Sequence, residues 1–260
     1  MKFSGGLSYA ERDGRALLLD VLAPEDAVGA PVVLYVHGGG WSGGDRGAGM
    51  HPWLNPLLAA HGYVTASLTY RLSDEAVWPA QLDDVGDAVT WLRAHADELG
   101  GDRARIGLWG HSAGAHIAAV AALGAGGGDG VQAVAVSACP ADFGADAGWQ
   151  DPSRTGQATA LVGAIGEDAR ARLVAASPVQ LVHPGAPPFL IAHGTADDVV
   201  PLGQGERLRD ALLAVGAAAQ WVPVPGAGHD WADLPSGRGR VEAQDTFGSV
   251  ALEFFDAHLR

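Results

Sequence analysis

The chain has 260 residues, of which 48% are hydrophobic and 18% are charged, and its formal net charge is −14. This length suits one α/β domain with a full buried core, and the single cysteine, Cys139, excludes a disulfide within the chain. The negative charge argues against binding of nucleic acid or of an anionic membrane through a broad basic surface. No secretory signal and no membrane-spanning run is visible, so a cytoplasmic protein is expected, with a mature secreted form as the alternative.

Short β-like runs alternate with helical stretches, which is typical of a mostly parallel sheet flanked by helices. In chain order, strands are predicted at residues 16–22, 32–36, 63–68, 105–109, 131–137, 189–192 and 220–224. One helix is predicted to begin at Pro79 and to end before Gly100, and further helices are predicted at residues 113–123, 206–215 and 241–259.

One long stretch, residues 142–188, departs from this alternation. It is rich in Ala, Gly, Asp and Arg, and long insertions of this kind are often functional. We therefore predict a single α/β domain over residues 1–260, with a small helical cap inserted at residues 142–188. The sequence leaves the oligomeric state open.

The pattern Gly-x-Ser-x-Gly occupies residues 110–114, between a predicted strand and a predicted helix. This strand–turn–helix setting is that of a nucleophile elbow, in which Ser112 projects above the sheet at a helix N-terminus. Gly110 and Gly114 suit a tight turn whose flanking positions have no room for large side chains. The alternative is an ordinary turn with a capping serine. This interpretation is disfavoured because the chain also contains the partner residues described below.

The segment His37-Gly38-Gly39-Gly40-Trp41 directly follows the predicted strand 32–36. A developing oxyanion needs backbone N–H donors with no side chain in the way, and we expect Gly39 and Gly40 to supply them together with Ala113. A phosphate-binding loop is the alternative, but no Gly-Lys-Ser/Thr follows. His37 is expected to brace the loop and not to carry a proton.

A histidine and two acids complete the pattern in the order Ser…Asp…His. His229 follows the predicted strand 220–224, and Asp197 and Asp198 follow the predicted strand 189–192. The histidine would take the proton of Ser112, and an aspartate would hold the imidazole in the correct tautomer. Either aspartate could serve, and we favour Asp197.

The remaining histidines form no metal-binding motif, so we predict neither a metal nor another cofactor. Cys139 lacks a Gly-x-Cys-x-Gly setting and is expected to be a small buried residue. Three tryptophans, Trp41, Trp78 and Trp231, are predicted to line the substrate site. Trp41 is favoured because it directly follows the oxyanion glycines.

Together these motifs resemble the hormone-sensitive-lipase-like esterases and the bacterial feruloyl-esterase-like and kynurenine-formamidase-like hydrolases. The resemblance covers about residues 17–259, and its blocks are His37-Gly38-Gly39-Gly40-Trp41, Tyr70-Arg71-Leu72, Trp78-Pro79-Ala80-Gln81, Gly110-His111-Ser112-Ala113-Gly114, His193-Gly194-Thr195-Ala196-Asp197 and Gly226-Ala227-Gly228-His229. It implies the α/β-hydrolase fold, a triad of Ser112, Asp197 and His229, and an acyl-enzyme mechanism without a cofactor.

Larger relatives carry cap helices before the glycine-rich loop, whereas the residues before His37 have mainly strand patterns here. The site is therefore expected to be open. The predicted function is hydrolysis of small-molecule esters with short acyl chains or aromatic acids, and the alternative is a kynurenine-formamidase-type amide hydrolysis. A non-catalytic binding module is disfavoured because His229 is present in its expected loop.

Overall fold

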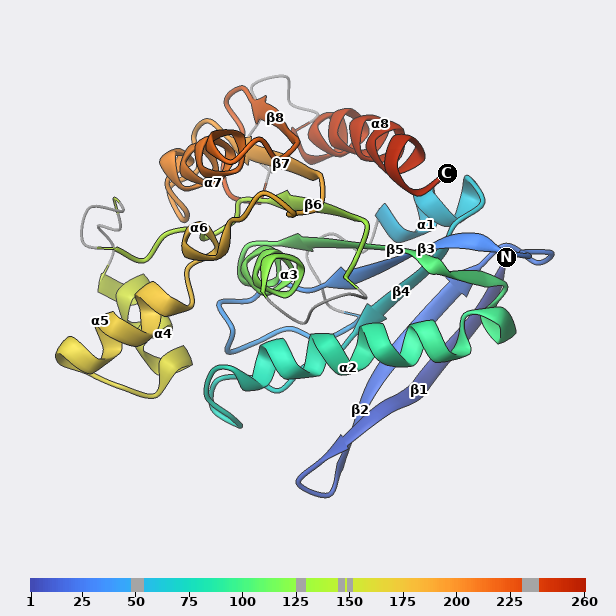
Figure 1. The fold of residues 1–260 in the computed structure, drawn as a ribbon, viewed down its shortest axis with the longest axis horizontal. Coiled ribbons are helices and arrows are strands. Elements are labelled where there is room, and N and C mark those ends of the chain that lie inside the picture. Colours follow the sequence, from blue (N-terminus) through green and yellow to red (C-terminus); the bar gives the residue numbers. More distant parts are fainter. Residues whose placement is uncertain (48–53, 125–129, 145–147, 149–151, 231–238) are drawn as a thin grey trace.

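The structure is a computed structural model that describes residues 1–47, 54–124, 130–144, 148, 152–230 and 239–260. The strands described form one sheet in the order β1-β2-β4-β3-β5-β6-β7-β8 (Figure 1). Their bounds are β1 Lys2–Arg12, β2 Arg15–Ala23, β3 Ala30–Val36, β4 Val64–Leu68, β5 Gly101–His111, β6 Ala133–Ser137, β7 Phe189–Gly194 and β8 Ala219–Val224. β2 is antiparallel to β1 and to β4, and all other neighbours are parallel. The predicted α/β fold with a mostly parallel sheet is confirmed.

Helices cover both faces of this sheet (Figure 1). Their bounds are α1 Leu54–Ala60, α2 Ala80–His95, α3 Ala113–Leu123, α4 Pro152–Val162, α5 Gly166–Ala175, α6 Pro178–Leu181, α7 Leu202–Ala214 and α8 Gly239–Leu259, with a short 3-10 helix at Asp97–Leu99. α1 and α8 pack on one face, and α2, α3 and α7 pack on the other. Every residue of β3 is buried, as expected for a strand covered on both sides.

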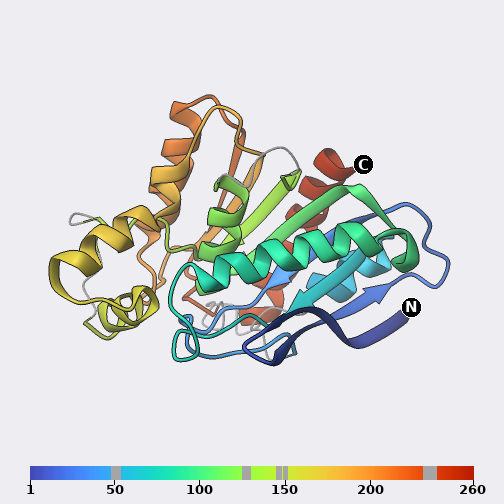
Figure 2. The ribbon, with the colours of Figure 1, turned by 60° about the horizontal axis from the view of Figure 1, so that its bottom comes forward.

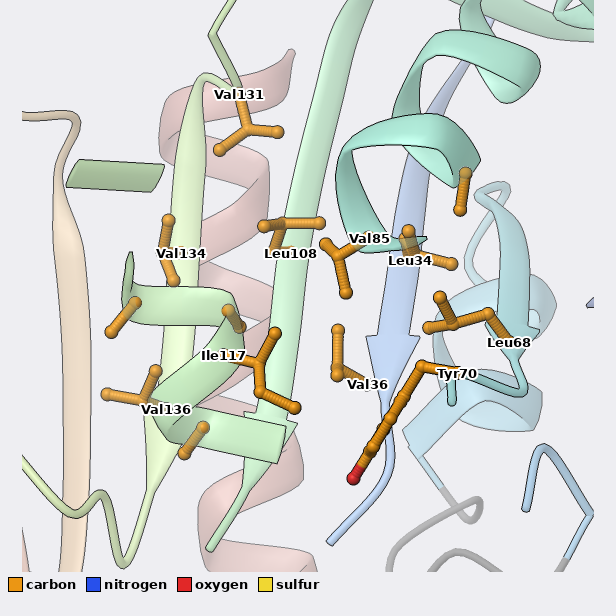
Figure 3. Close-up of a cluster of buried hydrophobic side chains, with 14 of the residues drawn as sticks. Leu34, Val36, Leu68, Tyr70, Val85, Leu108, Ile117, Val131, Val134 and Val136 are labelled. Atoms are coloured by element: carbon orange, nitrogen blue, oxygen red, sulfur yellow. The ribbon is translucent and has the colours of Figure 1, made fainter. Parts of the chain in front are cut away.

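The core between the sheet, α2 and α3 positions the elbow. Leu34 and Val36 of β3 face Val85 of α2 and Ile117 of α3, and all four side chains are fully buried (Figure 3). Burial of such a side chain contributes about 1.5–3 kcal/mol. This packing fixes the start of α3 against the end of β5, where the serine motif lies.

The predicted elements are present, and the differences lie at their ends and at two additional elements. α3 has the predicted bounds, whereas β5 extends beyond the predicted 105–109 at both ends. β1 and α1 were not predicted. β1 is an edge strand with mostly exposed residues, and α1 has only seven residues, so neither carries a long hydrophobic repeat.

The segment 142–188 contains α4, α5 and α6, between β6 and β7. Figures 1 and 2 both show α4 and α5 at one end of the molecule, beyond the carboxyl ends of the parallel strands. That this segment acts as a cap over a substrate stays a prediction. Within the described part of the chain, no helix is both long and apolar enough to cross a membrane.

Candidate active site

The turn between β5 and α3 holds Ser112 in a strained conformation, with φ 54° and ψ −123°. A Cβ atom on Gly114 would lie 2.0 Å from the carbonyl oxygen of Val36, and one on Gly110 would lie 2.5 Å from the carbonyl oxygen of Gly114. Neither position therefore accepts a side chain. The backbone N–H of Ser112 donates to the carbonyl oxygen of Ser137 at 2.9 Å, which ties the turn to β6.

Two hydrogen bonds join three side chains in a row, from Ser112 through His229 to Asp197. The Oγ atom of Ser112 lies 3.0 Å from Nε2 of His229, and Nδ1 of His229 lies 2.9 Å from Oδ2 of Asp197. A carboxylate only accepts hydrogen bonds, so Nδ1 carries the proton and Nε2 is free to accept the hydroxyl proton of Ser112. The side chain of His229 is 11% exposed, so a small molecule can approach the row from solvent.

Asp197 is held as a charged group inside the protein. Its Oδ1 accepts the backbone N–H groups of Val199 and Val200, both at 2.8 Å. Its Oδ2 lies 3.4 Å from Nε2 of His193 in addition to the bond from His229. Burial by itself raises the pKa of Asp197, but the hydrogen bonds from His193 and His229 outweigh it, and the pKa falls well below its usual range.

The loop after β3 lies against the elbow, since a Cβ atom on Gly38 would be 2.9 Å from the carbonyl oxygen of His111. Gly39, Gly40 and Trp41 have φ values of 120°, 61° and 61°, all in the left-handed region. A Cβ atom on Gly39 would lie 2.2 Å from the carbonyl oxygen of Gly43, so the loop closes on itself only with glycine there. Ala113 is the first residue of α3, and its N–H has no partner within the helix. We refer to residues 37–41, which are predicted to bind the oxyanion, as the oxyanion loop.

The match to a family model identifies the protein family of this chain. The family model BD-FAE matches residues 19–212 of the chain. The chain belongs to the BD-FAE family. The predicted resemblance to serine esterases of the α/β-hydrolase fold is thereby confirmed.

Individual proteins similar to this chain carry esterase names. Esterase LipC of Mycobacterium tuberculosis is 35% identical over 95% of this chain, which spans 64% of the length of LipC. Esterase 2 of Thermogutta terrifontis, solved with butyrate, is 26% identical with a TM-score of 0.78, over 97% of this chain and 93% of its own. A truncated carbohydrate esterase from gut microbiota is 25% identical with a TM-score of 0.80, over 99% and 96% of the two chains.

In this BD-FAE protein, Tyr70 packs on the oxyanion loop, and the next residue, Arg71, is held by two residues of α2. The ring of Tyr70 stacks on His37 at 4.2 Å, and its hydroxyl donates to the carbonyl oxygen of His37 at 2.9 Å. Arg71 donates to the buried carboxylate of Asp84 through Nη2 at 2.7 Å and Nε at 3.0 Å. Gln81 donates to the carbonyl oxygen of Arg71 at 3.0 Å. Burial lowers the pKa of His37, in keeping with the expected bracing role.

The three tryptophans predicted to contact substrate have different surroundings. Trp41 is only 3% exposed, and its indole N–H donates to Nδ1 of His116 at 3.2 Å. This burial leaves its ring little surface for a substrate. Trp78 is half-buried, with its ring 5.1 Å from that of His116. Trp231 lies outside the described residues.

Three residues beside the site were not identified from the sequence. Gln157 of α4 lies against the oxyanion loop, because a Cβ atom on Gly40 would be 2.7 Å from its Nε2. His193 and His116 are both fully buried. Each histidine lies four residues from a predicted site residue, before Asp197 and after Ser112, and that spacing is the only signal the sequence offers for them.

Of the other residues predicted for this region, Asp198 is exposed and Cys139 is fully buried. The side chains of His111, His229 and Asp230 offer possible metal ligands within 4.8 Å of one another. Both ring nitrogens of His229 already form hydrogen bonds within the row described above. A metal ion ligated through His229 would therefore have to displace one of those partners.

Proposed function

We propose that this protein hydrolyses carboxylic esters of short-chain or aromatic acids through an acyl-enzyme intermediate. Ser112 is the nucleophile, His229 the general base and Asp197 the acid that orients it. The observation that carries the proposal is the continuous pair of hydrogen bonds from Ser112 through His229 to Asp197, placed beside the oxyanion loop.

Each step of the proposed reaction is assigned to a particular group. Nε2 of His229 takes the proton of Ser112 as Oγ attacks the ester carbonyl carbon. The resulting oxyanion accepts hydrogen bonds from the N–H groups of Gly39, Gly40 and Ala113. The imidazolium, stabilised by the charged Asp197, then protonates the departing alcohol. Water attacks the acyl-enzyme with His229 again as base, which releases the acid and restores Ser112.

The preference for small acyl groups rests on the surroundings of Gly40 and on the relatives. The side chain next to Gly40 is the polar amide of Gln157, and a long acyl chain gains about 0.8 kcal/mol per methylene only where each methylene is buried against apolar surface. Esterase 2 of Thermogutta terrifontis has been solved with butyrate and with propionate. LipC also carries an esterase name, which favours ester over formamide substrates.

The test is a hydrolysis screen over p-nitrophenyl esters from acetate to laurate, methyl ferulate and N-formylkynurenine. We expect kcat/KM to be highest for acyl chains of roughly two to six carbons or for the aromatic ester, because the described side chain next to Gly40, that of Gln157, is polar and offers a longer chain little apolar surface. Ser112→Ala should lower kcat by at least ~10³ without changing the melting temperature. Ser8→Ala, on the exposed edge strand β1, is the matched control and should keep full activity.

Three results would contradict the proposal. The first is wild-type protein that hydrolyses none of the esters, and the second is a maximum at the longest acyl chain. The third is N-formylkynurenine exceeding every ester by tenfold or more in kcat/KM, which would instead assign the protein as a formamidase.

A further inference from the structure

The imidazole of His116 links the oxyanion loop to the inserted helices. Its Nδ1 lies 3.2 Å from the indole nitrogen of Trp41, and its Nε2 lies 2.8 Å from the carbonyl oxygen of Ala176, the C-cap residue directly after α5. An indole N–H can only donate and a carbonyl can only accept. The ring must therefore be neutral, with its proton on Nε2. Burial lowers the pKa of His116 to about 4, which agrees with a neutral ring.

His116 contacts Trp41, which is the last residue of the oxyanion loop and has a strained backbone conformation. Trp41 is a non-glycine residue at φ 61°, directly after two glycines in the same left-handed region. Such a backbone persists only where its surroundings hold it in place. The ring of Trp41 packs edge-on against the rings of His116 and Phe143, at 5.5 Å and 6.0 Å between centroids. The hydrogen bond to Nδ1 sets the direction of the indole within this packing.

His116 is also fixed relative to the proposed nucleophile, Ser112. The backbone N–H of His116 donates to the carbonyl oxygen of Ser112 at 3.0 Å, so His116 lies in the first turn of α3, which directly follows the N-cap residue Ser112. Any movement of Trp41 relative to His116 is therefore also a movement of the Gly39 and Gly40 N–H groups relative to the Ser112 hydroxyl.

We propose that His116 is a positioning residue that aims the oxyanion donors at the reacting carbonyl through its hydrogen bond to Trp41. The inference rests on the proposed ester hydrolysis. Because Nε2 holds Ala176 at the end of α5, His116 also couples the oxyanion loop to the insertion. Phe143 strengthens this connection, since its backbone N–H donates to Ser177 Oγ at 3.0 Å and its ring lies 5.3 Å from that of His116.

Two substitutions separate the two hydrogen bonds of the ring. The side-chain oxygen of His116→Asn occupies the place of Nδ1 and still accepts from Trp41, whereas the amide of His116→Gln occupies the place of Nε2 and reaches only Ala176. We expect His116→Gln to lower kcat by about 10- to 100-fold with KM changed less than threefold, because misplaced oxyanion donors act on the transition state. His116→Asn should stay within about threefold of wild-type kcat.

Two further variants test whether the effect passes through the indole. Trp41→Phe should lower kcat as much as His116→Gln, and the double variant should be no worse than either single variant, because one hydrogen bond is lost in all three. His95→Gln is the control, since His95 also packs on a tryptophan, Trp91, at 4.1 Å but lies at the far end of α2. It should leave kcat unchanged.

A spectroscopic measurement keeps this inference separate from the proposed function. In ¹⁵N-labelled protein, His116 should show a protonated Nε2 and an unprotonated Nδ1, and the indole proton of Trp41 should exchange faster in His116→Gln than in wild type. Equal kcat losses in the Asn and Gln variants, additive losses in the double variant, or the opposite tautomer would overturn the inference. If wild type hydrolyses no ester but the tautomer and exchange results hold, only the proposed function fails.

Discussion

The buried His116 should make the stability of this protein depend on pH in the mildly acidic range. Its pKa falls from 6.5 to about 4 on folding because burial disfavours the charged ring. Between these two values the unfolded chain binds a proton that the folded protein does not. The free energy of unfolding therefore decreases as the pH falls from about 6.5 to about 4.

The size of the effect follows from the shift. At about 1.4 kcal/mol per pKa unit, the loss attributable to His116 is about 3 kcal/mol, as an order of magnitude. Burial also lowers the pKa of His37, so the wild type should lose stability through that residue as well. The lowered pKa of Asp197 affects the free energy of unfolding over a different pH range. The stability that Asp197 contributes is lost only as the pH falls below about 3.8.

The assay is urea unfolding followed by tryptophan fluorescence at several pH values between 7 and 4.5, for wild type and His116→Gln. We expect the variant to be less stable at pH 7, because it loses a buried hydrogen bond. It has no titrating ring at this position, so its stability should depend less steeply on pH than that of wild type. Comparing the two curves removes the contribution of His37, which both proteins share. Parallel curves would refute the assignment of this pH dependence to His116.

The two remaining predictions each compare a buried aspartate with an exposed neighbour. Asp197→Asn should lower kcat by about 10⁴, because an amide no longer selects the required imidazole tautomer. Asp198→Asn should change kcat less than fivefold. Equal losses of kcat in steady-state assays of the two variants would show that the wrong carboxylate was assigned. Asp84→Asn should lower the free energy of unfolding by roughly 3–5 kcal/mol, because it leaves the largely buried Arg71 without a counter-charge. Asp83→Asn should change it by less than about 0.5 kcal/mol, and similar urea midpoints for the two variants would argue against a stabilising ion pair.

The local structural features of this protein could be predicted from its sequence. The serine turn needs only a strand, a helix and two glycines at Gly110 and Gly114, and all of these lie within a few residues of one another. The loop at residues 37–41 was predicted in the same way, because its glycines come shortly after a continuous apolar strand, and its role as the oxyanion hole stays a prediction. The parallel sheet also follows from local patterns, since strands buried on both faces are apolar throughout.

The roles of several polar and aromatic residues were decided only by tertiary structure. The helix predicted between Pro79 and Gly100 is present as α2, but the sequence did not show that its buried residues include the polar Gln81 and Asp84. Their partners come from the loop after β4. Trp41 was predicted to line the substrate site, but its side chain is only 3% exposed and its indole N–H donates to His116, a residue of α3 that lies far from the loop in the sequence. Propensity and periodicity report only on neighbours along the chain, whereas a buried polar group is stabilised by a partner that the fold brings to it from a distant segment.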